Sequence, residues 1–271
     1  RFISLQGDYH GDTFGSMSLT ARGGFNEPFE RFMFDVDFID IPTEKNRKEI
    51  LKKFEALLKT NDIAAFIFEP IVQGAGGMIM HSPEVLSELI GLCNQYGVIA
   101  ISDEVFTGFG RTGKMFAIDH CENKPDIICL SKGITGGFMA MGITAVSDKI
   151  YQAFYSDDKG KTFLHGHSYT GNALACSVAN ASLDLFEKED VWQNIETISE
   201  MQREFVRLIL ATPKVRAARS FGTIAAVELE ANEASSYFND KGKEAYKFLL
   251  EKGIILRPLG NVIVIIPPYC I

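Results

Sequence analysis

Three charged residues, Glu69, Asp103 and Lys132, each stand just past the end of an apolar run of the kind that forms a buried strand. The carboxyl ends of parallel strands lie at one edge of a sheet, and open α/β folds bind ligands at that edge. Two acids and a lysine at the ends of three successive strands therefore predict a chemical site at this edge.

An aspartate and a lysine at such an edge suit one kind of cofactor chemistry. Burial disfavours a charged amine, so a lysine at the end of a buried strand can act as a nucleophile and form a Schiff base with an aldehyde. Pyridoxal phosphate (PLP) supplies such an aldehyde, and its ring nitrogen needs a carboxylate partner, for which Asp103 has the right type and position. Spacing alone leaves a structural ion pair between Asp103 and Lys132 equally open.

The residues around these charges favour the cofactor interpretation. Tyr9 lies in a glycine-flanked loop, where its ring could stack on a flat cofactor. Ser168 precedes a helix and could hold a phosphate together with free backbone N–H groups. Three glycines that allow close approach of the backbone to a ring follow Lys132, namely Gly133, Gly136 and Gly137. Each of these features alone also has an ordinary structural explanation.

The hydrophobic pattern predicts a largely parallel sheet covered by helices. Four apolar runs are expected to be strands, at residues 64–68, 98–102, 126–130 and 142–146. Between the first two, Ser82-Pro83 opens a helix that ends at Gly97, because serine is a good N-cap, proline suits the first turn and glycine suits the C-terminal cap. Apolar strands that alternate with such crossovers are typical of an α/β fold.

The pattern changes near residues 187–190. Residues 171–187 predict a long buried helix, and residues 190–211 predict an amphipathic one. A strand, a helix and two short strands around a turn are expected beyond them, at residues 223–229, 240–252, 254–257 and 262–266. We therefore expect a large domain over residues 1–187 and a small α+β domain over residues 188–271.

Composition and chain ends limit the classes of function. The chain has 271 residues, a formal charge of −8 and 5 scattered Cys. This charge argues against nucleic acid or an anionic membrane as the main partner, and no apolar run approaches the roughly 20 residues of a membrane helix. Unpaired cysteines indicate a cytoplasmic protein. Because the chain starts inside a strand pattern and stops in apolar sequence, we expect a longer protein whose large domain lacks its beginning here and whose small domain lacks its end.

The order and spacing of several motifs identify a family. YHGDTFG at residues 9–15, EPIVQGAGGM at 69–78, and DE at 103–104 leading to GFGRTG at 108–113 resemble the class III aminotransferases of the fold-type I PLP-dependent enzymes. This resemblance covers nearly the whole chain. It implies a fold-type I PLP-transferase architecture, with a large domain built on a mostly parallel sheet and a smaller C-terminal α+β domain.

A second set of motifs resembles one branch of this class. The set contains Asp12 after Tyr-His-Gly, LSKG at 130–133 with TGG at 135–137, FLHG at 163–166 with GN at 171–172, and RP at 257–258 followed by IPPY at 266–269. The branch transfers an amino group from S-adenosylmethionine to 8-amino-7-oxononanoate in biotin biosynthesis, giving 7,8-diaminononanoate. The cofactor alternates between PLP and pyridoxamine forms.

The resemblance implies a role for each matching residue around the cofactor. Lys132 would be the Schiff-base lysine and would shuttle the proton. Asp103 would pair with the pyridinium nitrogen, and Val105 would pack against the ring. Tyr9 would stack near the cofactor and contact substrate, and His10 would belong to the cofactor-binding set.

The resemblance also implies substrate and subunit contacts. Arg257 would bind the carboxylate of the oxononanoate, while Asp12 and Gly166 would lie in the substrate-binding set. Ser168 stands where the family has a threonine that reaches the phosphate of the neighbouring subunit's cofactor, which implies a homodimer with shared sites. Glu69 would place neighbouring groups at the edge of the site.

Departures from the family pattern keep alternatives open. Val264 stands where the biotin branch often has tyrosine, so lysine as the amino donor, or another ω-aminotransferase activity (ornithine, 4-aminobutyrate or general amine type), stays open. A non-catalytic nucleotide-binding module is the alternative from another class. His165 and His167 lack a third ligand at suitable spacing, so no metal site is expected. Five phenylalanines that alternate with polar residues are expected in the core, namely Phe25, Phe29, Phe32, Phe34 and Phe38.

Overall fold

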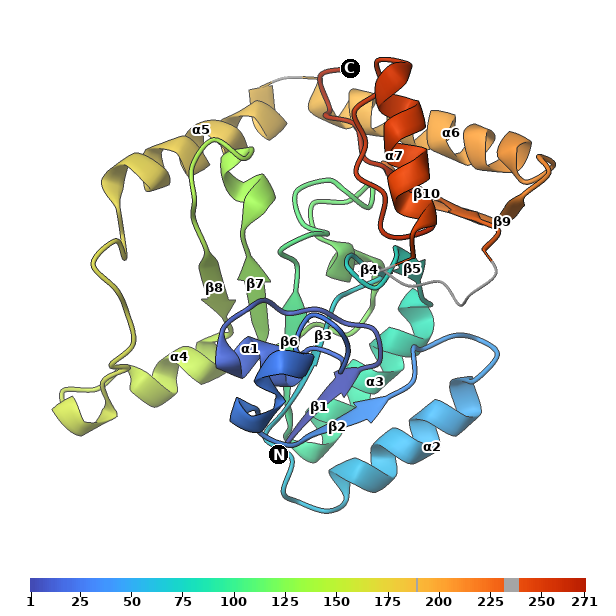
Figure 1. Ribbon diagram of the computed structural model, residues 1–271. Coiled ribbons are helices and arrows are strands. Elements are labelled where there is room, and N and C mark those ends of the chain that lie inside the picture. The colour runs from blue at the N-terminus through green and yellow to red at the C-terminus, as the bar shows by residue number, and fades with distance from the viewer. Residues whose placement is uncertain (189, 232–238) are drawn as a thin grey trace.

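The computed structural model describes residues 1–188, 190–231 and 239–271, and its centre is a six-stranded sheet (Figure 1). The strands lie in the order β2-β1-β3-β6-β7-β8. Their bounds are β1 Phe2–Leu5, β2 Val36–Ile39, β3 Ala65–Phe68, β6 Ile99–Asp103, β7 Ile127–Leu130 and β8 Ile143–Val146. All neighbouring pairs from β2 to β7 are parallel, which confirms the predicted α/β sheet.

The last strand departs from the prediction of parallel strands joined by crossovers. β8 runs antiparallel to β7, with Leu130 opposite Ile143. The connecting residues 131–142 contain only η3 (Lys132–Thr135), a single turn of 3₁₀ helix. A parallel return needs a crossover, usually a full α-helix, whereas a short connection returns the chain antiparallel.

Two amphipathic helices cover one face of the sheet, α2 (Arg47–Leu58) and α3 (Pro83–Tyr96). The hydroxyl of Ser82 accepts a hydrogen bond from the N–H of Val85, and Gly97 adopts a left-handed conformation at φ 70°, which confirms both predicted ends of α3. The ring of Phe54 on α2 packs edge-on against Phe66 of β3, with ring centroids 4.9 Å apart. This packing holds α2 against β3, the strand that ends just before Glu69.

Short elements lie in the connections between the strands and helices of this part of the chain. They are α1 Phe14–Leu19, η1 Glu27–Phe32, β4 Val72–Gln73, β5 Ile79–Met80, η2 Ala117–His120, α4 Asp148–Phe154 and η4 Lys159–Lys161. β4 and β5 pair antiparallel and hold the loop after β3 in place.

A second, three-stranded antiparallel sheet forms the C-terminal part, in the order β11-β10-β9. Its elements are α6 Val191–Ile209, β9 Val215–Phe221, β10 Ile224–Leu229, α7 Lys241–Glu251 and β11 Val262–Ile265. Ile224 of β10 and Val262 of β11 share one continuous apolar core with the large sheet. The division into domains 1–187 and 188–271 stays a prediction, and residue 189 at its boundary lies outside the described residues.

The predicted strand at residues 254–257 is wrong. These residues pair with no strand of the described chain and instead follow the end of α7, where the N–H of Ile254 bonds to the carbonyl of Leu249. Apolar character alone does not make a strand without a neighbouring strand to pair with.

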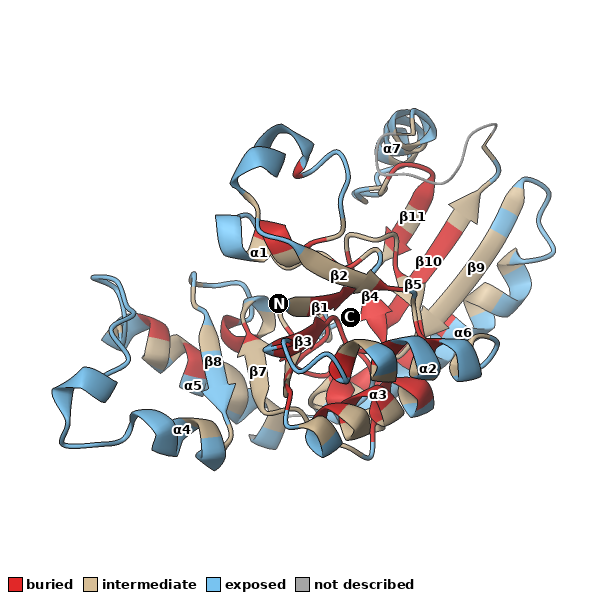
Figure 2. Cartoon of the chain, turned by 90° about the horizontal axis from the view of Figure 1, so that it is seen from below, coloured by how far each residue is buried: buried red, intermediate tan, exposed pale blue. Residues whose placement is uncertain are grey.

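The expected burial of α5 (Ala173–Lys188) is also wrong. Among the residues of α5 whose burial is described, only Ala175 and Ala179 are buried, whereas Leu174 is 69% exposed. Most of the outer side of α5 is exposed or half-buried (Figure 2). One face of α5 packs on η3, where the hydroxyl of Ser182 bonds to the carbonyl of Gly133, and the outer face is uncovered. Among the described helices, none has the length and apolar character to cross a membrane.

The expected phenylalanine core is absent as well. Phe25, Phe29, Phe32 and Phe34 are all exposed, and Phe38 is half-buried. The exposed rings lie in and around η1, outside the sheet, and the ring of Phe32 packs instead against Phe14 with centroids 5.2 Å apart. The alternating pattern reflects a cluster at the surface, because η1 packs on the short helix α1 and no strand of the described sheets covers its phenylalanines.

Candidate active site

Glu69, Asp103 and Lys132 lie at the same edge of the large sheet, as the sequence pattern predicts. They stand at the carboxyl ends of β3, β6 and β7, which are neighbouring parallel strands. No ion pair joins Asp103 to Lys132 in the part of the chain that the structure describes, because Asp103 bonds to other partners. The alternative of a structural pair between these two residues is therefore not supported.

Asp103 is held from two sides. Its Oδ2 accepts a hydrogen bond from Nδ1 of His10 at 2.8 Å, and its Oδ1 accepts one from the N–H of Val105 at 3.1 Å. Both oxygens are thus fixed by groups that lie on different elements, the loop after β1 and the turn after β6. A carboxylate fixed in this way presents a constant orientation toward the upper edge of the sheet.

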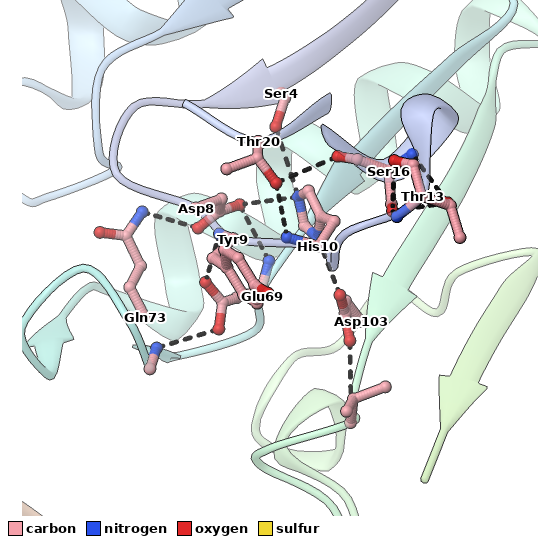
Figure 3. A network of polar contacts seen from close by, with 12 residues as sticks. Ser4, Asp8, Tyr9, His10, Thr13, Ser16, Thr20, Glu69, Gln73 and Asp103 are labelled. Atoms are coloured by element: carbon pink, nitrogen blue, oxygen red, sulfur yellow. Dashed lines mark hydrogen bonds and ion pairs between the residues drawn. The ribbon is translucent and has the colours of Figure 1, made fainter. Parts of the chain in front are cut away.

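His10 is buried between acidic groups (Figure 3). Its Nε2 lies 3.6 Å from a carboxylate oxygen of Asp8 and 3.4 Å from the hydroxyl of Ser4. Burial lowers the pKa of His10, but the hydrogen bond to Asp103 and the charges of Asp8 and Glu69 outweigh it and raise the pKa above its usual value. The arrangement therefore favours a charged imidazolium beside Asp103.

Glu69 organises the backbone around the site. Its carboxylate accepts hydrogen bonds at 2.9 Å from the N–H of Tyr9 and the N–H of Gly74. Burial, followed by the charge of Asp8, raises the pKa of Glu69 to about 8. Both hydrogen bonds come from backbone groups, so Glu69 holds the loop after β1 against the loop after β3; its placing role at the site stays a prediction.

Tyr9 and Asp12 form a pair at the exposed rim. The hydroxyl of Tyr9 donates a hydrogen bond to Oδ1 of Asp12 at 2.7 Å. Burial, and then this bond to Asp12, raises the pKa of Tyr9 to about 12. Tyr9 also lines a cavity of about 390 Å³ that Leu259 and Val262 of the small sheet border on the other side.

Lys132 lies in a strained but exposed turn. Its φ of 45° is in the left-handed region, and its Nζ lies 5.8 Å from the centre of the Phe106 ring. The side chain is exposed, so the burial that the sequence argument assumed is absent. The reason is the position of β7 near the end of the sheet, beside the largely exposed strand β8.

Ser168 and Gly166 do not join this cluster. Both are exposed in the loop between η4 and α5. Ser168 is not at the N-terminus of α5 either, because Asn172 caps that helix by accepting a hydrogen bond from the N–H of Ala175. Their predicted roles are untested within one copy of the chain.

Arg257 lies in the irregular segment between α7 and β11 and is exposed. Leu259, two residues further on, lines the same cavity as Tyr9. The residues that follow Arg257 therefore border this cavity.

One buried acid of the site, Asp8, was missed in the sequence. Asp8 accepts hydrogen bonds from Nε2 of Gln73 at 2.7 Å and from the N–H of Glu69 at 3.0 Å. The available signal was an acid two positions before a histidine, in the loop that already contained Tyr9. That signal is weak, because loop acids are usually exposed.

Comparison with known proteins identifies the family to which this site belongs. A sequence profile of the class-III aminotransferases matches residues 1–271. The chain belongs to this family. The adenosylmethionine-8-amino-7-oxononanoate aminotransferase of Synechococcus elongatus is 41% identical over 100% of this chain and 65% of its own length. The chain thus spans about two thirds of the length of this relative.

Solved structures of the family support the same fold. The adenosylmethionine-8-amino-7-oxononanoate aminotransferase of Methanocaldococcus jannaschii has a TM-score of 0.91 and 37% identity, covering 99% of this chain and 63% of that one. An amine transaminase from an uncultivated Pseudomonas species, solved in its PLP-bound form, has a TM-score of 0.91 and 28% identity, covering 100% of this chain and 65% of that one.

PLP is the cofactor of class-III aminotransferases, and the residues of this chain fit it. Asp103 provides an almost buried carboxylate with both oxygens oriented, which suits a cationic ring nitrogen. Lys132 provides an accessible amine from the neighbouring strand, which suits an aldehyde. This pair of groups on adjacent strands is the donor set that the cofactor needs.

Proposed function

We propose that this protein transfers an amino group from S-adenosylmethionine to 8-amino-7-oxononanoate and so makes 7,8-diaminononanoate for biotin biosynthesis. The observation that carries the proposal is the orientation of Asp103 by His10, at the sheet edge where Lys132 ends the next strand. Family membership supports the reaction class, and the names of the similar relatives support the substrates.

Lys132 is the proposed base and covalent anchor. When bound, PLP supplies an aldehyde and an electron-withdrawing ring. The turn that carries Lys132 is fixed beside it by the hydroxyl of Ser131, which donates to the carbonyl of Met141 at 2.6 Å. An amine on a fixed turn can take a proton from one carbon and return it to another without moving its backbone.

Asp103 is the proposed partner of the ring nitrogen. Its negative charge favours a protonated ring, and the bonds from His10 and Val105 keep its oxygens in place. Val105, in the turn after β6, is the proposed packing contact for the ring. His10 supports Asp103 from behind and completes the cofactor-binding set.

The rim of the cavity is the proposed substrate site. Arg257 and Asp12 would supply one cation and one anion to the acceptor, a keto acid that carries an amine. The planar guanidinium of Arg257 suits a carboxylate, and the carboxylate of Asp12 suits an amine. Tyr9, whose hydroxyl bonds to Asp12, would contact the substrate between them.

A homodimer with shared sites is part of the proposal. The segment around Ser168 and Gly166 is rich in exposed apolar side chains, with Leu164 90% and Tyr169 75% exposed. Such a surface is the kind that a second copy buries. Ser168 would then reach the phosphate of the neighbouring cofactor.

The amino donor is the point that most needs a test. Val264, which replaces the tyrosine often found in the branch, is buried in β11 opposite Ala226 and offers no hydroxyl. We would load the purified protein with PLP and record its absorption spectrum after adding S-adenosylmethionine, lysine, ornithine or 4-aminobutyrate. Conversion to the amine form with S-adenosylmethionine alone is the expected result.

The other outcomes of this screen separate the alternatives. Conversion by lysine, with 8-amino-7-oxononanoate still accepted, would replace the proposed donor. Conversion by ornithine or 4-aminobutyrate alone would show another ω-aminotransferase activity and contradict the proposed reaction of the biotin branch. Nucleotide binding without any PLP spectrum would contradict the enzyme proposal itself.

A further inference from the structure

Asp8 is a fully buried acid beside the proposed cofactor site. Its Oδ1 accepts a hydrogen bond from Nε2 of Gln73 at 2.7 Å, and its Oδ2 accepts one from the N–H of Glu69 at 3.0 Å (Figure 3). These bonds fix the carboxylate in one position without neutralising its charge. A buried carboxylate is costly unless a cation lies nearby, so its surroundings must supply one.

The nearest cation available to Asp8 is the imidazole of His10. Nε2 of His10 lies 3.6 Å from Oδ2 of Asp8, and the two side chains are 1% and 0% exposed. The opposite nitrogen, Nδ1, bonds to Asp103 at 2.8 Å. The ring of His10 therefore stands between two carboxylates, one of which is the proposed partner of the cofactor nitrogen.

We propose that Asp8 is a positioning residue for Asp103 and acts through His10. The charge of Asp8 favours a proton on Nε2, so that Nδ1 keeps its own proton as the donor to Asp103. His10 then remains an imidazolium that aims Asp103 and favours its anionic form. The inference rests on the proposed role of Asp103 toward the ring nitrogen.

The charges that face His10 support this assignment. Asp8 comes from its own loop, Glu69 from the end of β3, and Asp103 from the end of β6. Burial raises the pKa of Asp8 and of Glu69, whereas the charge of His10 lowers the pKa of both acids, and the acids in turn raise the pKa of the imidazole despite its burial. Ser4, the remaining neighbour of Nε2, is neutral and lies 3.4 Å away, so it cannot replace the charge of Asp8.

The test reads the protonation of His10 directly. We would label the histidines of the PLP-loaded protein with ¹⁵N and follow the side-chain nitrogens by NMR from pH 5 to pH 9, assigning His10 by its substitution. Wild-type His10 should carry protons on both nitrogens at neutral pH. Asp8→Asn, which removes the charge and keeps the size, should lower the titration midpoint of His10 by about one pH unit or more. Ser4→Ala, which removes only the neutral neighbour, should leave that midpoint unchanged.

A second readout follows the effect to the cofactor. In Asp8→Asn, the pH midpoint of the absorption of bound PLP should move together with that of His10, and kcat should fall about tenfold while KM changes less than twofold. A wild-type His10 that is neutral at pH 7, or an Asp8→Asn midpoint equal to that of the wild type, would overturn the inference; the wild-type arm needs no variant to fold. If Asp8→Asn shifts the titration midpoint of His10 but not the pH midpoint of PLP absorption, the role of Asp103 in the proposed function fails. The role of Asp8 as a positioning residue then fails with it. If PLP does not bind at all, the proposed function fails by itself, and the titration of His10 without cofactor still tests its coupling to Asp8.

Discussion

Nδ1 of His10 lies 2.8 Å from Oδ2 of Asp103, and this bond ties the loop after β1 to the end of β6 across 93 residues of sequence. β3 separates these two strands in the sheet, so the contact passes over its upper end, where Glu69 stands. The proposed cofactor-binding carboxylate is therefore oriented by a loop that also carries Tyr9 and Asp12. The proposed cofactor-binding and substrate-binding residues are therefore positioned by the same loop.

Removing Asp103 should disable the site. Loss of one partner of a buried charge pair costs about 3–5 kcal/mol, so Asp103→Ala should lower kcat/KM by at least a factor of about 100 and weaken PLP binding. Steady-state kinetics and a PLP titration would measure both effects. Asp40→Ala, at an exposed acid, is the control and should behave as the wild type. Unchanged kinetics in Asp103→Ala would contradict the role of Asp103.

The loop after β3 should not tolerate a side chain at residue 76. A Cβ on Gly76 would lie 2.5 Å from the carbonyl oxygen of Gly7, in the turn that leads to Tyr9. We expect Gly76→Ala to lower the free energy of unfolding by about 1–3 kcal/mol and to raise KM, because the turn that positions Tyr9 must shift. Gly15→Ala, where a Cβ meets nothing within 4 Å, is the matched control. Equal stability and KM in the two variants would refute this packing argument.

His81 should make stability depend on pH in the acidic range. Burial lowers the pKa of His81 to about 4, while the usual value in an unfolded chain is about 6.5. The unfolded chain therefore binds a proton that the folded protein lacks between these values, so the stabilising contribution is present above pH 6.5 and is lost as the pH falls to 4. The expected loss is about 3 kcal/mol.

Urea unfolding of His81→Asn and wild type at several pH values would measure this contribution as a difference. His165→Asn, at an exposed histidine, is the control. Its free energy of unfolding should depend on pH in the same way as that of the wild type. Parallel pH profiles for His81→Asn and the wild type would show that His81 does not carry the effect.

Arg257 should determine recognition of the acceptor. Arg257→Lys keeps the charge but loses the planar two-point contact with a carboxylate, which is worth about 1.5–3 kcal/mol. We expect KM for 8-amino-7-oxononanoate to rise roughly ten- to a hundredfold while the half-reaction with the amino donor keeps its rate. Arg207→Lys, on the exposed face of α6, is the control. An equal loss in both half-reactions would argue that Arg257 supports the fold and not the acceptor site.

The parallel core of the fold was predictable from local pattern. The apolar runs of β3, β6 and β7 end at charged residues, and the caps at Ser82 and Gly97 mark α3, so the sequence placed the three charges at one edge. The direction of β8 was not predictable in this way, because apolar content does not record which way a strand runs. The exposure of α5 was also hidden, since an apolar face predicts burial without saying what covers it.

The polar residues of the site were also only partly predictable from the sequence. Lys132 and Asp103 stood out because they follow strands, whereas Asp8 acquires its role only when Gln73 and Glu69 fold against it. Contacts of this kind join residues more than 60 positions apart, and no spacing rule encodes them. The exposure of Lys132 likewise depends on the edge position of β7 in the sheet.

The covalent attachment of PLP to Lys132 tests the account most directly. We would load wild type, Lys132→Ala and Lys48→Ala with PLP, reduce them with borohydride, and locate the attached cofactor by peptide mass spectrometry; Lys48 is a surface lysine on α2. The account predicts attachment on the peptide that contains Lys132 in the wild type and in Lys48→Ala, and none in Lys132→Ala. A cofactor fixed to another lysine of the wild type, or still fixed to the Lys132→Ala protein, would contradict it.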